Sequence, residues 1–260
     1  MSSLERLDVA LAARGLAPSR ERARRLILAG LVFVDGQRAA HAGDRVRAGS
    51  EIRVAGPDHE FVSRGGVKLA HALAEFGIPV EGRICADVGA STGGFTDCLL
   101  QRGAAKVHAI DVGYGQLAWK LRTDPRVVVH ERTNARTLAP RSLDPAPSLA
   151  VIDASFISLR LLLPATLAQL IEPAEIVALV KPQFEVGRER VGPGGVVREP
   201  QWRTEAVASV VEAARALGLE LRANGESPIR GAKKGNVELL VHLAQASAGG
   251  LRGDGPAGAG

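Results

Sequence analysis

Short apolar runs alternate with helical stretches over most of this chain, and that alternation restricts its fold more than any other feature. The runs that predict strands are Ile84–Val88, Val107–Asp111, Val127–His130, Leu149–Asp153, Ile176–Val180, Leu219–Leu221 and Val237–Leu243. Helical stretches lie between most of them, at Phe95–Arg102, Leu117–Arg122, Leu161–Ile171 and Thr204–Leu217. Such alternation predicts an α/β, Rossmann-like domain with helices on both faces of a seven-stranded sheet. Because no helix separates the last two strands, we expect a mostly parallel sheet with one antiparallel strand.

A smaller unit precedes this domain. A helical pattern from Leu4 to Leu11 ends at Gly15, and Ser19 is a typical N-cap for a second helix. Two short alternating runs, 31–34 and 51–54, predict strands, and we expect Asp35-Gly36 to form the turn between them. We therefore divide the chain into an N-terminal unit (1–55), a linker (56–62), the α/β domain (63–245) and a Gly-, Ala- and Ser-rich tail (246–260) that we expect to be disordered.

Arginines are concentrated on the second predicted helix of the small unit. A net charge of +5 favours an anionic partner, although charge alone is a weak indication. Four arginines within six residues on a helix beside an apolar stripe form a surface suited to phosphates, and a solvated helix face explains the same charges equally well. The candidate RNA-binding residues of the whole chain are Arg6, Arg20, Arg22, Arg24, Arg25 and Arg64.

A glycine-rich loop after the first strand of the α/β domain predicts a cofactor site. Glycines let a backbone approach a ligand closely, and Asp111, at the end of the next strand, can accept hydrogen bonds from the ribose hydroxyls of an adenosine. A dinucleotide site needs G-x-G-x-x-G, which is missing here. Asp87, which we expect to point into the loop, would repel a pyrophosphate but suits the ammonium of a methionine moiety, so we predict S-adenosylmethionine. The candidate cofactor-binding residues are Asp87, Gly89, Ser91, Thr92, Gly93, Gly94, Phe95, Asp111, Val112, Asn134 and Asp153.

Four charged residues lie at the edges of predicted strands or at the start of a helix: Lys68, Asp153, Lys181 and Glu238. Charges at the ends of apolar strands are costly to bury unless they are paired. Only six of the 33 basic residues are lysines, so a lysine at such a place favours a need for its titratable amine. A purely structural network of salt bridges is the alternative.

These four residues resemble, in order and context, the K-D-K-E tetrad of FtsJ-type ribose 2′-O-methyltransferases. The flanking runs are similar to the TlyA family over about residues 4–243, and the small unit resembles the αL RNA-binding motif. The runs are Phe61–Gly66, Asp111–Leu117, Glu131–Asn134, Asp153–Leu159 and Val180–Glu185. Two departures are Phe61, where the family pattern has Tyr or Trp, and the loop Arg230–Lys234, which is about one residue longer.

The resemblance implies an enzyme that methylates the 2′-hydroxyl of a cytidine in ribosomal RNA. Its partners would be ribosomal RNA or ribosomal subunits, with no membrane, no obligate protein partner and no metal, and we expect a cytoplasmic protein. Lys181 would be the base, its proton affinity reduced by Lys68 and by partial burial, while Asp153 and Glu238 orient the amines.

Three other classes of function remain open from the residues. A non-catalytic RNA-binding assembly factor could keep this fold, although the intact tetrad argues against it. The family's historical label suggests a membrane-active hemolysin. No secretory signal is visible, and the longest apolar stretch, 159–171, has about half the length of a membrane span, so both observations argue against this class. A dinucleotide oxidoreductase is the weakest alternative, because its glycine fingerprint is missing.

Overall fold

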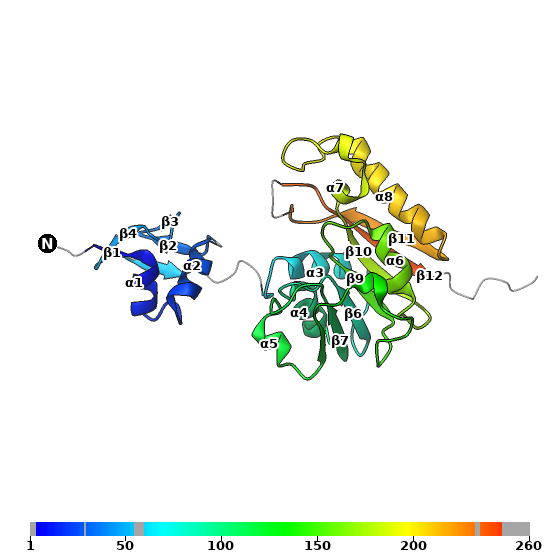
Figure 1. Ribbon diagram of the computed structural model, residues 1–260, viewed down its shortest axis with the longest axis horizontal. Coiled ribbons are helices and arrows are strands. Elements are labelled where there is room, and N and C mark those ends of the chain that lie inside the picture. The colour runs from blue at the N-terminus through cyan, green and yellow to red at the C-terminus, as the bar shows by residue number, and fades with distance from the viewer. Residues whose placement is uncertain (1–3, 29, 55–59, 232–234, 246–260) are drawn as a thin grey trace, which may run out of the picture. The chain divides into compact units, whose positions relative to one another are not determined.

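The computed structural model describes residues 4–28, 30–54, 60–231 and 235–245, in two compact units divided after Glu60 (Figure 1). Most of the predicted linker and the predicted disordered tail, 246–260, lie outside the described residues. Within the described residues no helix is long and apolar enough to cross a membrane.

The N-terminal unit packs two helices against two small sheets. Its elements are β1 (Leu4–Arg6), α1 (Leu7–Ala13), α2 (Arg20–Leu28), β2 (Val32–Val34), β3 (Gln37–Arg38), β4 (Arg45–Arg47) and β5 (Ile52–Val54). β3, β2 and β5 form one antiparallel sheet, and β1 pairs with β4. Leu7, Leu11, Ile27 and Val32 are almost fully buried and join both helices to β2.

Two predictions for this unit are wrong. The first helix begins at Leu7, because residues 4–6 pair as a strand with β4, a partner 40 residues away that local periodicity does not show. Asp35-Gly36 joins β2 to β3 and not to the strand at 52–54. Both turn residues have positive φ, 50° and 79°, so the chain reverses within two residues and pairs Val34 with Gln37 at once. The 52–54 strand then pairs with the other edge of β2.

The second unit confirms the predicted α/β sheet. Its strands are β6 (Ile84–Val88), β7 (Lys106–Ile110), β8 (Val127–His130), β9 (Leu149–Ile152), β10 (Glu175–Val180), β11 (Leu219–Glu226) and β12 (Leu239–Gln245). Its helices are α3 (Gly65–Glu75), α4 (Gly94–Gln101), α5 (Trp119–Arg122), α6 (Leu159–Leu167), α7 (Pro182–Glu185) and α8 (Pro200–Arg215). The sheet order is β11-β12-β10-β9-β6-β7-β8, and β12 is antiparallel to both of its neighbours while the other pairings are parallel.

Alternate strand residues fill two core layers, one on each face of the sheet. Leu69 of α3 and Leu99 of α4 pack with Val151 on one face. Leu163 of α6 and Val210 of α8 belong to the layer on the other face, and Figure 1 shows these helix pairs on either side of the strands. The carboxyl ends of β6, β7, β9 and β10 consequently meet at one edge. Because β12 runs the other way, with Leu239 opposite Val180, its first residues reach that same edge.

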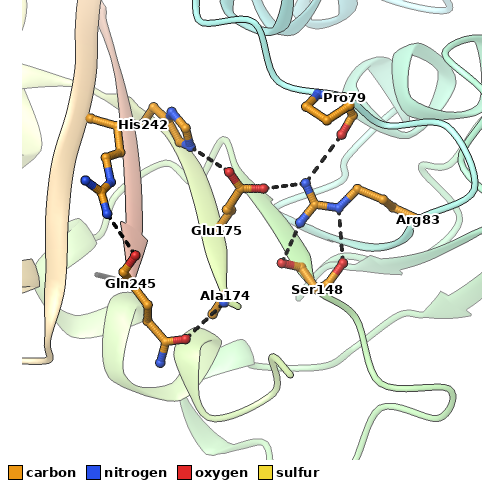
Figure 2. Close-up of polar contacts among 8 residues, drawn as sticks. Pro79, Arg83, Ser148, Ala174, Glu175, His242 and Gln245 are labelled. Atoms are coloured by element: carbon orange, nitrogen blue, oxygen red, sulfur yellow. Dashed lines mark hydrogen bonds and ion pairs between the residues drawn. The ribbon is translucent and has the colours of Figure 1, made fainter. Parts of the chain in front are cut away.

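A polar cluster joins the strands at the opposite edge, around the carboxylate of Glu175 (Figure 2). The side chains of His242 and Arg83 reach Glu175 from two sides, with His242 Nε2 3.2 Å from Oε1 and an ion pair between Arg83 and Oε2. Arg83 also donates to the hydroxyl of Ser148 at 3.1 Å and to its carbonyl oxygen at 2.9 Å. The cluster therefore connects the residues just before β6 and β9, and the first residue of β10, to β12.

We expect Glu175→Gln to destabilise the α/β unit at neutral pH and much less in acid. The hydrogen bond with His242 and the ion pair with Arg83 lower the pKa of Glu175 to about 2. A lowered carboxyl pKa contributes stability above its unfolded value of about 4.3, and that stability is lost as the pH falls through the folded value. The contribution at pH 7 is on the order of 2–3 kcal/mol. The free energy of unfolding of parent and variant is measured by denaturant unfolding between pH 7 and pH 2, and the difference between the two should shrink below about pH 4.5. A difference that does not change with pH would contradict this account.

Candidate active site

The loop after β6 forms the floor of the site, and its geometry requires glycine. Gly89 has φ 88°, and a Cβ there would lie 2.7 Å from the carbonyl oxygen of Asp153, so the loop and the end of β9 could not approach so closely with a side chain between them. A Cβ on Gly94, the first residue of α4, would lie 2.2 Å from the hydroxyl oxygen of Ser63. The glycines thus let three segments meet at the edge of the sheet.

Two adjoining hollows open on this floor. The first, of about 280 Å³, lies over the loop and α3, and the second, of about 450 Å³, lies toward the end of β7. They share Gly89, Ser91, Asp153 and Ser155 as lining residues. A bound molecule that spans this common wall would present its middle to Asp153.

The second hollow contains the residues predicted to hold an adenosine. Asp111, Val112 and Asn134 line it together with apolar side chains such as Ile110 and Leu162. The carboxylate of Asp111 accepts hydrogen bonds from Ser91 N at 2.8 Å and Gly113 N at 2.6 Å, which fixes it at the rim. The Asn134 side chain accepts from Arg136 N at 3.1 Å and caps the 3₁₀ turn Ala135–Thr137.

The other predicted cofactor residues divide into two groups. Thr92, Gly94 and Phe95 line the first hollow. Gly93 lines neither of the two hollows; it adopts φ 95° before α4, where a Cβ would lie 2.2 Å from Leu121 Cδ1. Its role is to let α5 pack on the loop.

Asp87 lies beneath the loop and does not point into it, which corrects the sequence-based prediction. Its side chain is fully buried, and Oδ2 accepts hydrogen bonds from Thr96 N at 2.9 Å and from Thr96 Oγ1 at 2.7 Å. Burial raises the pKa of this carboxyl to about 7. The amide groups exposed in the first turn of α4 attract the carboxylate, so Asp87 positions that helix, and it lines neither hollow.

The four charged residues of the predicted tetrad meet beside the first hollow as two ion pairs. Lys68, from α3, pairs with Glu238, and both are buried. Lys181, at the end of β10, has its Nζ 2.6 Å from Asp153 Oδ1. Lys68, Asp153 and Lys181 line the hollow, whereas Glu238 does not, so the residue just before β12 supplies a carboxylate from behind Lys68.

Two residues that the sequence reasoning missed also hold this arrangement. The hydroxyl oxygen of Ser155 accepts a hydrogen bond from Lys181 Nζ at 2.9 Å. Glu185, at the end of α7, is buried and accepts hydrogen bonds from Ser158 Oγ at 2.6 Å and from Leu159 N at 2.8 Å. Burial raises the pKa of Glu185. These contacts fasten the segment after Lys181 to the segment after Asp153. The family-like runs Asp153–Leu159 and Val180–Glu185 contain both residues, but neither run shows what these side chains contact.

Three of the predicted RNA-binding arginines converge on one buried carboxylate in the N-terminal unit. Asp8 is fully buried, and its oxygens lie 3.0 Å from Arg6 Nε, 3.0 Å from Arg24 Nε and 3.4 Å from Arg20 Nη2. The hydrogen bond from Arg6 is the largest of the effects that hold the pKa of Asp8 well below its usual range. About half of each of the three arginine side chains remains exposed. Arg22 is exposed too, and the side chain of Arg25 lies outside the described residues.

Comparison with known proteins assigns both units. Residues 61–245 match the model of the FtsJ-like methyltransferase family, and residues 5–52 match the S4 domain. The 16S/23S rRNA (cytidine-2'-O)-methyltransferase TlyA of Mycobacterium tuberculosis is 50% identical over 244 residues, which cover 94% of this chain and 91% of the relative.

Two further relatives carry the hemolysin label. Hemolysin A of Brachyspira hyodysenteriae is 42% identical and covers 92% of this chain and 99% of the relative. A solved structure described as a hemolysin from Streptococcus thermophilus has a TM-score of 0.74 at 44% identity, covering 95% of this chain and 90% of that one. With matches of this extent, the chain belongs to the TlyA family of FtsJ-like methyltransferases, a family that implies S-adenosylmethionine as methyl donor.

Proposed function

We propose that this chain transfers a methyl group from S-adenosylmethionine to the 2′-hydroxyl of a cytidine in ribosomal RNA. The observation that carries the proposal is the position of Lys181 and Asp153, an ion pair at the wall shared by the two hollows. The printed activity of the Mycobacterium tuberculosis relative supports the same reaction and substrate.

The second hollow fits the adenosine part of the donor. Asp111 offers carboxylate oxygens at its rim for ribose hydroxyls, and Ile110, Val112 and Leu162 offer apolar surface for a base. Gly89, whose lack of a side chain lets the loop pack against the end of β9, lines both hollows, so the floor is continuous between them. When bound, S-adenosylmethionine supplies a methyl group that its sulfonium has already activated.

The chain's own task is to position the acceptor and remove its proton. A ribose hydroxyl is a poor nucleophile at neutral pH, so a base within hydrogen-bond reach accelerates the transfer. In its neutral form Lys181 accepts the 2′-hydroxyl proton at Nζ and becomes the ammonium that pairs with Asp153, and Asp153 and Ser155 fix where this atom lies. The Lys68–Glu238 pair holds the opposite part of the hollow and orients the acceptor.

The N-terminal unit binds the RNA in this proposal. Arg6, Arg20 and Arg24 are held in place by Asp8 and still expose about half of their side chains, which suits contact with phosphates. Arg22 of α2 is exposed as well, and Arg25 stays a candidate from the sequence. The partner would be ribosomal RNA or a ribosomal subunit.

Methyl transfer to defined RNA tests the proposal directly. The purified chain is incubated with methyl-labelled S-adenosylmethionine and either naked ribosomal RNA or isolated ribosomal subunits, and the label is mapped after nuclease digestion. We expect 2′-O-methylcytidine, recognised because the adjacent phosphodiester resists alkaline cleavage. Label on a base would contradict the chemistry. Binding of RNA and S-adenosylmethionine without any transfer would instead indicate an assembly factor, and leakage of liposomes without transfer would indicate a membrane-active protein.

A further inference from the structure

Two exposed arginines from distant parts of the chain line the first hollow beside the tetrad. Arg64 is the residue before α3, and Arg230 lies in the segment between β11 and β12. Both are exposed, whereas Lys68 and Lys181 in the same hollow are buried. Arg64 is one of the RNA-binding candidates predicted from the sequence, and Arg230 is not.

The charges of the buried lysines are balanced, and those of the two arginines are not. Lys68 is paired with Glu238, and Lys181 with Asp153. Over the described parts of the chain, neither Arg64 nor Arg230 has a carboxylate within ion-pair distance. The hydrogen bond of Arg230 is a long one, 3.4 Å, to the carbonyl oxygen of Gly235. The hollow is therefore neutral at its paired lysines and positive at Arg64 and Arg230.

We propose that Arg64 and Arg230 form a clamp for the phosphodiester next to the ribose that is methylated. A guanidinium presents a planar fork of donors that matches phosphate oxygens, and it keeps its charge at all physiological pH values. A 2′-hydroxyl is separated from the phosphate on O3′ of the same sugar by only a few bonds. A phosphate held by these arginines therefore places the sugar in the hollow that Lys181 and Asp153 line. The clamp rests on the proposed function, since it requires an RNA substrate.

If the two arginines form this clamp, their loss weakens RNA binding in a salt-dependent way and leaves the rate of the methyl-transfer step unchanged. For Arg64→Ala and for Arg230→Ala we expect the KM for RNA to rise roughly tenfold, as for the loss of one charge-assisted contact. Each change should lower the slope of log Kd for RNA against log salt by about one, because one phosphate contact is lost. The kcat at saturating RNA and the affinity for S-adenosylmethionine should stay at the parent values. Arg215→Ala is the matched control. Arg215 is the last residue of α8, close to the start of β11, and therefore lies at the edge of the sheet opposite the hollow.

The measurements separate failure of the clamp from failure of the proposed function. RNA affinity is measured by anisotropy with a labelled single-stranded oligonucleotide as well as by turnover, so the clamp is tested even if no methyl is transferred. Parent-like affinity and salt slope in both alanine variants would overturn the clamp, and so would a fall in kcat with unchanged KM. Arg230→Gln, which removes the charge but keeps a polar side chain with hydrogen-bond donors, should reproduce the alanine result; full activity in that variant would exclude a role for the charge.

Discussion

Lys181→Ala is expected to slow methyl transfer by about 10²- to 10⁴-fold, the usual contribution of a general base. The side chain contacts both Asp153 and Ser155 and lines the first hollow, so the change removes the proposed proton acceptor and leaves the lining of the second hollow unchanged. Single-turnover transfer with saturating RNA and donor is the measurement, since it reports the chemical step. The affinity for S-adenosylmethionine should change by less than about threefold, because catalytic and binding losses are separable.

Lys181→Arg separates the base from the ion pair. Arginine can keep the contact with Asp153 but is not deprotonated in proteins, so it should be as slow as alanine while retaining more of the stability. Lys106→Ala serves as the control, since Lys106 begins β7 at the opposite edge of the sheet. Near-parental transfer by either Lys181 variant would exclude Lys181 as the base.

Asp8→Ala is expected to unfold much of the N-terminal unit while the α/β unit stays intact. The change removes a fully buried carboxylate and leaves Arg6, Arg20 and Arg24 without their common partner. Loss of one member of a buried pair costs about 3–5 kcal/mol, and we expect about 2 kcal/mol here because the arginines are half-exposed and regain water. A unit of this size has only a few kcal/mol of stability in total, so the loss is a large part of it.

Hydrogen exchange in the full chain is the measurement for Asp8→Ala. Amides of α1 and α2 should lose protection, those of β9 and β10 should keep theirs, and RNA affinity should fall while donor binding is retained. Glu5→Ala is the matched control, because Glu5 forms a partly exposed pair with Arg14 at 3.0 Å, and exposed pairs contribute about 0–1 kcal/mol. Equal protection in the two variants would show that the Asp8 cluster does not stabilise this unit.

The sequence predicted the α/β sheet well because its strands are continuous apolar runs between helical stretches. Ile84–Val88 and Val127–His130 have the predicted bounds. The antiparallel β12 agrees with the prediction made from the absence of a helix between the last two strands. Long-range pairing was beyond such reasoning. Residues 4–6 carry a helical pattern, yet they pair with β4 because hydrogen bonds to a distant strand outweigh weak local preference.

Most residues of the candidate site could be predicted from the sequence, but the direction in which some of their side chains point could not. Lys68, Asp153 and Lys181 were expected at one edge of the sheet, and the structure places them in one hollow. Local sequence could not show that Asp87 faces α4 instead of the loop, because a carboxylate after a strand suits either place. Asp8 and Glu185 escaped notice for the same reason: their partners come from elements that only the fold brings near.

The place of β12 between β10 and β11 has a consequence for how this enzyme matures during synthesis. The Lys68–Glu238 contact joins residues that are 170 positions apart, which is nearly the whole length of the α/β unit. β11 precedes β12 in the chain but pairs with the sheet only through it, so β11 can join the sheet only with β12 or after it. Contacts of such high order form late in folding. A nascent chain can therefore form the close contact between Gly89 and Asp153 well before the Lys68–Glu238 pair, which needs β12 in the sheet.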